Sequence, residues 1–280
     1  MSTDLKFYAV IGNPIAHSKS PDIHAQFAAQ CGIALRYKRV LAPVEGFAAM
    51  VDELRAQGLQ GCNVTVPFKL DAFAYADVLS DAARWAGAVN TLTFKDDGKA
   101  YGDNTDGVGL VRDITHNLGV ALQGKKVLLL GAGGAARGVL RPILNERPAG
   151  VVVKNRSLDK AHTWLAQIVQ NTDFAQVTQG IVLSVQAWAD ETLESYDVVI
   201  NATASGLSDE FTSPSGVRLS KNALAYDMMY GKQTGFMTWA QSQGAQVADG
   251  WGMLVEQAAA SFQIWHGIAP DTAPLLQRGA

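Results

Sequence analysis

Residues 125–140, KKVLLLGAGGAARGVL, place a short apolar run directly before a glycine-rich turn and a stretch of helical character. The run Val127–Leu130 predicts a buried strand, and Gly131 permits the tight turn that follows it. Gly133 lets backbone N–H groups approach a pyrophosphate, and Ala136 lets the next helix pack close to the strand. A helix that begins here directs its partial positive charge at the phosphates. The pattern G-x-G-x-x-A therefore predicts a dinucleotide site formed by Gly131, Ala132, Gly133, Gly134 and Ala135.

The end of the next predicted strand indicates which dinucleotide is bound. The stretch VVVKNRSLDKA, residues 151–161, carries Asn155 and Arg156 where an NAD enzyme has an acidic residue for the ribose 2′-hydroxyl. Arg156 can instead pair with a 2′-phosphate, and Lys160 lies one helical turn later. The two cations could also be solvated side chains at a helix start, and Asp159 nearby weakens the case slightly. The pattern favours NADP over NAD.

Apolar, β-branched runs alternate with helix-like stretches along the chain. Strands are expected at 7–12, 37–42, 61–66, 86–94, 126–131, 149–155, 180–185, 196–202 and 222–230. Helices are expected at 21–32, 44–58, 68–79, 135–144, 158–169 and 252–268. This alternation predicts βαβ units and a mostly parallel sheet. We expect an α/β protein of two domains: residues 1–105, on which the C-terminal helix of 251–280 packs back, and a Rossmann-like NADP-binding domain at 106–250.

The composition is that of a protein with a sizeable core. Of the 280 residues, 48% are hydrophobic and 18% are charged, which argues against disorder. The net charge of −3 lacks the basic excess of a nucleic-acid-binding protein. No apolar run approaches the ~20 residues that a membrane span needs, and Asp4 interrupts any signal-like start. We expect a cytoplasmic monomer or homodimer whose partner is a small-molecule substrate, neither nucleic acid nor membrane.

Cysteine and histidine usage indicates neither disulfides nor metal. Cys31 and Cys62 form no CxxC pair, and the five histidines show no zinc spacing. Two reduced, partly buried thiols are typical of a cytosolic protein. No metal site is expected.

A lone lysine ends the stretch NVTVPFK, residues 63–69. By itself, Lys69 could be a solvated side chain where the chain leaves a strand. A carbonyl reductase, however, needs a group that supplies a proton to the carbonyl oxygen as hydride arrives, and lysine is one candidate. Asp106, in the stretch DNTDG, could cap the helix that follows it or keep a neighbouring lysine charged. If the two meet, they titrate as a coupled unit.

Eight ordered blocks over nearly the full chain resemble the shikimate dehydrogenase family. They are VIGNPIAHSKSP (Val10–Pro21), NVTVPFK (Asn63–Lys69), GAVNTL (Gly87–Leu92), GDNTDGVG (Gly102–Gly109), GAGGAARG (Gly131–Gly138), NATASG (Asn201–Gly206), DMMY (Asp227–Tyr230) and DGWGMLVEQAA (Asp249–Ala259). The resemblance implies reversible, NADP-dependent reduction of 3-dehydroshikimate to shikimate, a step of aromatic amino-acid biosynthesis.

The resemblance also implies roles for individual residues. Lys69 and Asp106 match the catalytic pair of the family, and Ser18 and Ser20 match hydroxyls that bind the substrate carboxylate. Further substrate contacts are implied at Asn63, Thr65, Asn90, Asp106, Tyr230 and Gln257. Cofactor contacts are implied at Asn155, Arg156, Lys160, Thr203, Gly250 and Met253. Lys160 stands where the family often has arginine, which softens the expected NADP preference without reversing it.

Two other functions are compatible with the sequence. One is a related dehydrogenase that acts on quinate, or on both acids with NAD; quinate carries one more ring hydroxyl, for which the site near Ser18 must make room. The other is a catalytically silent ligand-sensing module, which binds without turnover and usually carries an appended partner or DNA-binding segment. The chain has no room for such a segment, and both members of the candidate catalytic pair are present, so the enzyme is favoured.

Overall fold

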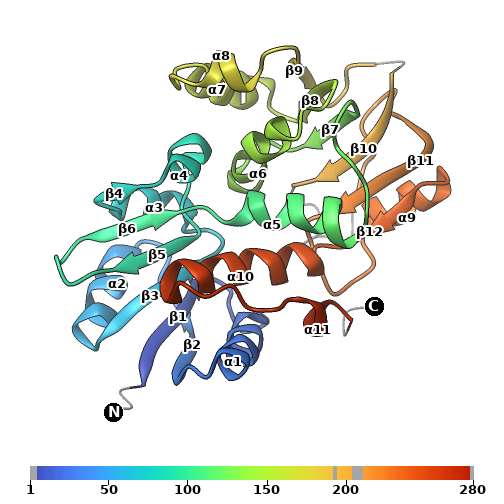
Figure 1. Ribbon diagram of the computed structural model, residues 1–280. Coiled ribbons are helices and arrows are strands. Elements are labelled where there is room, and N and C mark those ends of the chain that lie inside the picture. Colours follow the sequence, from blue (N-terminus) through green and yellow to red (C-terminus); the bar gives the residue numbers. More distant parts are fainter. Residues whose placement is uncertain (1–4, 192–193, 204–210, 278–280) are drawn as a thin grey trace. The chain divides into compact units, whose positions relative to one another are not determined.

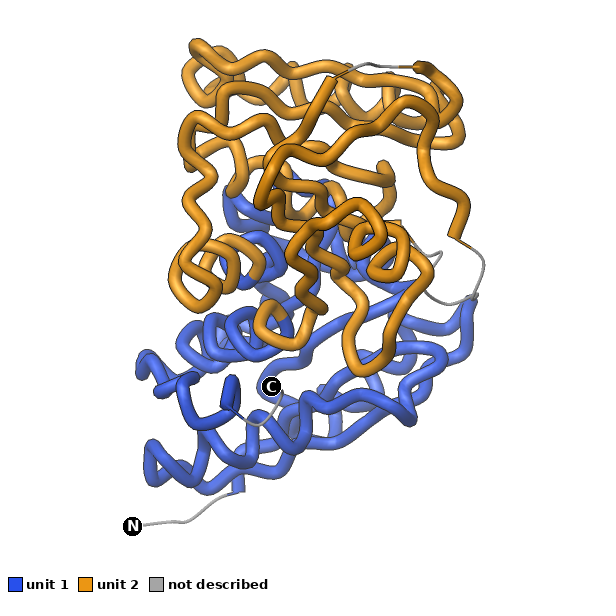
Figure 2. Tube along the Cα trace, turned by 90° about the vertical axis from the view of Figure 1, so that its right-hand side faces the viewer, with its two compact units in different colours: residues 1–109, 254–280 blue, residues 110–253 orange. Residues whose placement is uncertain are grey.

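The computed structural model describes residues 5–191, 194–203 and 211–277. The chain divides into two compact units, which Figure 2 shows in separate colours. Unit 1 comprises Met1–Gly109 and Leu254–Ala280, and unit 2 comprises Leu110–Met253. Unit 1 is therefore built from two separate stretches of sequence, and Asp106 falls within it.

Unit 1 contains a six-stranded mixed sheet (Figure 1), with the strand order β2-β1-β3-β5-β6-β4. β1 pairs in parallel with β2 and β3, whereas β5 runs antiparallel to β3 and β6. The bounds are β1 (Lys6–Gly12), β2 (Leu35–Leu41), β3 (Leu59–Val64), β4 (Val78–Leu79), β5 (Thr91–Phe94) and β6 (Ala100–Asp103).

The helices of unit 1 begin and end at local sequence signals. α1 has Pro21 in its first turn and ends at Gly32, whose φ of 65° suits a residue without a β-carbon. Ser80 caps α4 by accepting a hydrogen bond from the Ala83 N–H at 3.1 Å. The bounds are α1 (Ser20–Cys31), α2 (Phe47–Ala56), α3 (Lys69–Tyr75), α4 (Asp81–Ala86) and α11 (Ala273–Leu276), while α5 (Asp106–Arg112) and α10 (Trp251–His266) contain the boundaries between the units.

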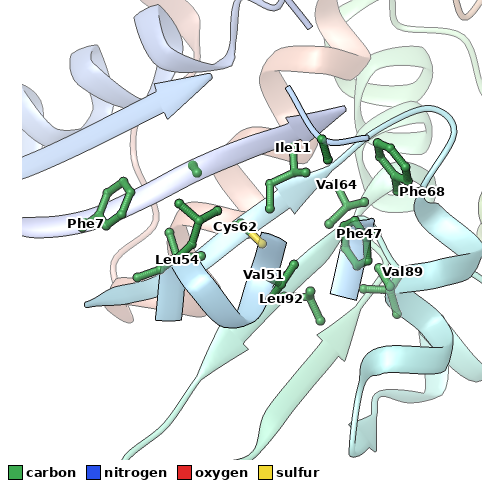
Figure 3. Packing of buried hydrophobic residues seen from close by; sticks show 14 of the residues in the cluster. Phe7, Ile11, Phe47, Val51, Leu54, Cys62, Val64, Phe68, Val89 and Leu92 are labelled. Carbon is green, nitrogen blue, oxygen red and sulfur yellow. The ribbon is translucent and has the colours of Figure 1, made fainter. Parts of the chain in front are cut away.

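The core of unit 1 lies between its sheet and α2. Figure 3 shows side chains of β1 (Phe7, Ile11) and β3 (Cys62, Val64) beside those of α2 (Phe47, Val51, Leu54). All of them are at most 8% exposed. Burying one such large side chain contributes about 1.5–3 kcal/mol. This layer fixes β1 and β3, the two strands that lead into the VIGNPIAHSKSP loop and the NVTVPFK stretch.

Unit 2 contains a parallel sheet with the strand order β12-β11-β10-β7-β8-β9. From β7, the chain adds β8 and then β9 on one side of the sheet. It then returns to the other side of β7, where it adds β10, β11 and β12. In open α/β sheets, ligands bind at the carboxyl ends of the strands beside such a reversal. The glycine turn follows β7 and therefore lies at this point.

The elements of unit 2 alternate as the sequence predicts. Its strands are β7 (Lys126–Leu130), β8 (Gly150–Asn155), β9 (Val182–Ala187), β10 (Ser195–Asn201), β11 (Arg218–Asp227) and β12 (Gln246–Ala248). Its helices are α6 (Gly134–Asn145), α7 (Leu158–Ile168), α8 (Phe174–Val177), α9 (Gly235–Ser242) and the π-helix η1 (Asp113–Asn117). Within the described ranges, no helix combines the length and the apolar character that crossing a membrane requires.

The expected α/β architecture with mostly parallel strands is confirmed, but two segments differ from the prediction. Residues 68–79, expected as one helix, form α3 and then β4, because Ala76 takes an extended backbone and the Asp77 N–H donates to Ala100 O at 2.9 Å. Residues 86–94 were expected to be extended throughout. They form a strand only from Thr91, because α4 continues to Ala86 and the chain then turns.

Gly61 of β3 is expected to tolerate no larger residue. A β-carbon there would lie 2.6 Å from Trp265 Nε1 and 2.7 Å from Leu92 O, two groups that hydrogen-bond to each other at 3.1 Å. Gly61→Ala should therefore lower the free energy of unfolding by about 1–3 kcal/mol through overpacking. Urea denaturation measures this, with Leu41→Ala, at a side chain 61% exposed, as the control. Equal losses in the two variants would contradict this account of the packing.

Candidate active site

Lys69 and Asp106 form a partly buried ion pair in unit 1. Lys69 opens α3 just after β3, and Asp106 opens α5. The ammonium Nζ lies 2.5 Å from Asp106 Oδ2, and the two side chains are 18% and 7% exposed. Charges withdrawn this far from water need each other and further hydrogen bonds. Lys69 is therefore not a solvated surface lysine.

Two asparagines hold the other polar atoms of Asp106. Asn90 Nδ2 donates to Asp106 Oδ1 at 2.8 Å, and Asn104 Oδ1 accepts from the Asp106 backbone N–H at 3.1 Å. The carboxylate also stands in the first turn of α5, where the helix dipole favours an anion. Both carboxylate oxygens thus take part in charge-assisted contacts, which fix the position of the side chain.

Gln257 joins this group from α10. Its Oε1 lies 3.4 Å from Asn90 Nδ2, and its Nε2 donates to Leu254 O at 2.9 Å. The residue is 8% exposed. A cation, an anion and two amides from four separate parts of the sequence thus lie together. We call Lys69, Asn90, Asp106 and Gln257 the Lys69 cluster.

Ser18 and Ser20 form a second polar group, where the chain passes from β1 into α1. Ser18 Oγ donates to Ser20 Oγ at 3.3 Å, and both residues are buried. Arg39 Nε donates to Ser18 O at 2.8 Å and so holds the loop. Thr65 lies next to Gly12 at the end of β1: a β-carbon on Gly12 would lie 2.5 Å from Thr65 Cγ2. Neighbouring hydroxyls of this kind can donate together to a carboxylate.

Asn63 is turned inward. Its Oδ1 accepts from the Tyr37 hydroxyl at 2.6 Å and lies 3.1 Å from His24 Nε2. Its Nδ2 donates to Ser261 Oγ at 2.9 Å and to Thr91 Oγ1 at 3.2 Å. The sequence reasoning did not single out these four neighbours. The only feature of the sequence that could have indicated such neighbours is a polar residue within an otherwise apolar run, as Ser261 is.

The glycine turn of unit 2 has the backbone that an anion site needs. Gly131 adopts a φ of 104°, and a β-carbon there would lie 3.1 Å from Ala202 O and 3.3 Å from Thr203 Cγ2. At Gly133 and Gly134, nothing lies within 4 Å of the position that a β-carbon would take. Gly133 is also the N-cap of α6 and supplies no side-chain cap. The open surface and the uncapped helix start suit a phosphate group.

The candidate 2′-phosphate residues follow β8, the neighbour of β7 in the sheet. Asn155 ends the strand, and its Nδ2 donates to Ser157 O at 2.7 Å. The guanidinium carbon of Arg156 lies 5.8 Å from the centroid of the Trp188 ring, a cation–π contact. Lys160 lies in the first turn of α7, and both cations are exposed. Two cations thus lie at the same sheet edge as the glycine turn.

A buried carboxylate, which the sequence reasoning did not select, joins the ends of β10 and β11. Asp227 Oδ2 accepts from the Thr234 hydroxyl at 2.5 Å and from Asn201 Nδ2 at 3.2 Å, and its Oδ1 accepts from the Met229 N–H at 3.0 Å. Burial raises the pKa of Asp227. Thr203 Oγ1 donates to Asn201 Oδ1 at 2.7 Å, so this carboxylate also orders the start of the NATASG block. Residues 204–206 of that block lie outside the described residues.

Gly250 and Met253 lie at the start of α10, within unit 2. A β-carbon on Gly250 would lie 2.3 Å from Met228 O, so only glycine fits. The Met253 N–H donates to the Tyr226 hydroxyl at 3.3 Å, and that hydroxyl donates to Asp113 Oδ2 at 2.6 Å. Burial raises the pKa of Tyr226 well above its ordinary value, so the phenol stays protonated.

The predicted residues thus fall into two sets. Those in unit 1 are Ser18, Ser20, Asn63, Thr65, Lys69, Asn90, Asp106 and Gln257. Those in unit 2 are the glycine turn, Asn155, Arg156, Lys160, Thr203, Gly250, Met253 and also Tyr230, which had been expected at the substrate. The ring of Tyr230 packs edge-on against Trp251, with 6.3 Å between centroids. Among the described side chains, no three His, Cys, Asp or Glu residues gather as a metal site would require.

Three family models match the chain. They are the shikimate dehydrogenase substrate binding domain at residues 10–92, shikimate / quinate 5-dehydrogenase at 113–208 and the shikimate 5′-dehydrogenase C-terminal domain at 250–278. A relative from Methylobacillus flagellatus, named shikimate dehydrogenase (NADP(+)), is 54% identical over 96% of this chain and 97% of its own length.

Solved structures agree with these matches. The Ael1 enzyme of Pseudomonas putida is 40% identical, with a TM-score of 0.85 and 98% of each chain covered. Shikimate 5-dehydrogenase of Thermus thermophilus, solved in complex with NADP(H) and shikimate, is 29% identical, with a TM-score of 0.82 over 98% of this chain and all of its own. This chain therefore belongs to the shikimate dehydrogenase family.

Proposed function

We propose that this chain is an NADP-dependent shikimate dehydrogenase, which reversibly reduces 3-dehydroshikimate to shikimate. The observation that carries the proposal is the partly buried Lys69–Asp106 contact at 2.5 Å, with the amides of Asn90 and Gln257 beside it. The 54% identity to a relative of that name, over nearly the full length of both chains, supports the same activity.

In this proposal, the Lys69–Asp106 pair manages the proton at the reacting oxygen. The bound cofactor supplies the hydride. As the carbonyl carbon accepts the hydride, negative charge develops on its oxygen, and an ammonium already in place stabilises that charge and gives up a proton. Asp106 holds the Lys69 ammonium in place. In the reverse reaction, the same pair removes the proton from the hydroxyl.

The remaining side chains of unit 1 suit a hydroxylated ring acid. We assign the substrate carboxylate to the Ser18 and Ser20 hydroxyls, and the ring hydroxyls to Thr65, Asn90 and Gln257. Each of these side chains offers a donor, an acceptor or both. Tyr230, from unit 2, is assigned a supplementary substrate contact on the family resemblance alone.

Unit 2 is assigned the NADP site. At Gly133 and Gly134 nothing lies within 4 Å of the position of a β-carbon, which leaves space at the start of α6, where a pyrophosphate gains from the helix dipole. Arg156 and Lys160 supply the positive charge for a 2′-phosphate. Thr203, Gly250 and Met253 are assigned further contacts to the cofactor, as the family resemblance implies.

The direct test follows the absorbance of reduced nicotinamide while the protein is given shikimate and NADP⁺. Quinate and NAD⁺ are tested in parallel, because one matching family model is named for both acids. We expect turnover with shikimate and NADP⁺ to exceed the other three combinations. Faster turnover of quinate would identify quinate as the preferred substrate. No turnover of either acid would contradict the proposed function.

Lys69→Ala is expected to lower kcat by about 10²–10⁴-fold, because the group that donates the proton is lost. The affinity for NADPH, measured by fluorescence titration, should be unchanged, since Lys69 lies in unit 1. Lys99→Ala, at an exposed lysine of the same unit, is the matched control and should retain full activity. Near-normal turnover by Lys69→Ala would remove this lysine from the mechanism.

Arg156→Ala is expected to raise the KM for NADPH about 10- to 100-fold, the effect of losing charge-assisted hydrogen bonds to a phosphate. The KM for NADH should change little, because NADH has no 2′-phosphate. Arg218→Ala, at an exposed arginine of unit 2, controls for the loss of a positive charge. Equal effects on both cofactors would contradict the assignment of Arg156.

A further inference from the structure

Three hydroxyls are buried next to Asn90. Thr91 and Ser261 are fully buried, and Thr105 is 2% exposed. Ser261 Oγ lies 2.8 Å from Thr91 Oγ1 and 3.2 Å from Thr105 Oγ1, so the hydroxyls of β5, α10 and the segment before α5 meet at one point. We call Thr91, Thr105 and Ser261 the hydroxyl hub. The function proposed above assigns no task to any of the three.

The orientation of the Asn90 amide follows from one backbone contact. Asn90 Oδ1 lies 2.9 Å from the Thr105 backbone N–H, which can only donate. The oxygen of the amide therefore faces Thr105, and the nitrogen faces Asp106 Oδ1 at 2.8 Å. With the opposite orientation, two donors would face each other at Thr105, and two acceptors would face each other at Asp106.

This orientation of the Asn90 amide also determines which atom receives the proton of the Thr91 hydroxyl. Thr91 Oγ1 lies 2.8 Å from Asn90 Oδ1, and an amide oxygen only accepts, so the Thr91 hydroxyl donates to Asn90. Thr91 Oγ1 is then an acceptor toward Asn63 Nδ2 at 3.2 Å and toward Ser261 Oγ at 2.8 Å, whose single proton is shared between Thr91 Oγ1 and Gln257 O at 3.0 Å. The hydroxyl hub thus holds the Asn90 amide, and this amide in turn holds the Asp106 carboxylate.

Asn63 also contacts the hydroxyl hub, through Thr91 and Ser261. Around its amide lie Tyr37 Oη at 2.6 Å, His24 Nε2 at 3.1 Å, Ser261 Oγ at 2.9 Å and Thr91 Oγ1 at 3.2 Å. Because the Thr91 hydroxyl gives its proton to Asn90, it can only accept here, so the nitrogen of the Asn63 amide faces Thr91 and its oxygen faces Tyr37. Burial lowers the pKa of His24 to about 3, which keeps its ring neutral at the pH of the assay. The polar atoms of Asn63 all face protein partners.

We propose that Thr91 is a positioning residue: supported by Ser261 and Asn63, its hydroxyl fixes the Asn90 amide so that the amide N–H points at Asp106. The inference rests on the proposed function, and it gives Asn63 a supporting task instead of the substrate contact that the family resemblance implies. In a water-poor interior, a fully satisfied network of this kind holds its groups rigidly. Preorganised neighbours of a reacting group then save reorganisation during the reaction.

The test compares Thr91→Val with Thr91→Ser. Valine keeps the shape and the strand preference of threonine but removes the hydroxyl, whereas serine keeps the hydroxyl. We expect Thr91→Val to lower kcat about tenfold, as expected for one hydrogen bond beside a charged group, with the KM for NADPH unchanged. Thr91→Ser should restore most of that loss. Thr93→Val, on the same strand, controls for the substitution itself and should keep wild-type kcat.

A double-mutant cycle with Asn90→Ala separates positioning from general destabilisation. If Thr91 acts through Asn90, Thr91→Val should have little further effect on kcat once Asn90 is alanine. The same tenfold loss in both backgrounds, or no loss in the Thr91→Val single variant, would overturn the proposal. Rates are compared per folded molecule, with the folded fraction taken from circular dichroism.

A second readout does not require activity. In ¹⁵N-labelled protein, the side-chain NH₂ resonances of Asn90 should shift and broaden in Thr91→Val and return in Thr91→Ser. Unchanged resonances in Thr91→Val would overturn the positioning role even in a fully active enzyme. If the wild-type protein did not turn over shikimate, the proposed function would be wrong. The Asn90 resonances would still show whether Thr91 fixes the amide.

Discussion

The contact between the Lys69 ammonium and the Asp106 carboxylate is the constraint on which the rest of unit 1 depends. A pair of charges mostly removed from water is stable only if the remaining lone pairs and protons are also satisfied. Asn90 donates a hydrogen bond to the carboxylate, and Asn104 accepts one from the Asp106 backbone N–H. Asn90 in turn needs partners of its own, and these include the Thr105 backbone N–H and buried hydroxyls. One ion pair thus accounts for a polar layer inside a unit whose core is otherwise apolar.

Unit 2 holds its candidate ligand by different means. Its site relies on the backbone: Gly131 takes a conformation that glycine favours, while Gly133 and Gly134 leave space before α6. The charged side chains among the candidate cofactor residues, Arg156 and Lys160, follow the neighbouring strand β8. Backbone donors suit a phosphate of any dinucleotide, and in the proposed function the exposed cations select among dinucleotides. Buried polar groups such as Asp227 serve to hold the strand ends in place.

The sequence correctly predicted those parts of the fold that local residue patterns specify. The glycine turn required a particular residue type at each position, and alternating apolar runs gave the order of strands and helices. The failures have causes that lie outside the local pattern. Residues 68–79 carry a helical pattern throughout, yet pairing with β6 makes Val78 and Leu79 a strand. The antiparallel course of β5 left no local mark, because a strand pattern does not specify its partner.

By itself, the sequence determined the α/β class, the dinucleotide turn, the preference for a 2′-phosphate and, through family resemblance, the identity of the candidate catalytic residues. Only the tertiary structure decided that Lys69 meets Asp106, that Asn63 faces inward, and that a hydroxyl hub stands behind Asn90. The physical reason is separation along the chain. Asn63 and Ser261 are hydrogen-bonded across 198 positions, and a contact of that kind is set by how elements pack, which no local pattern of residues records.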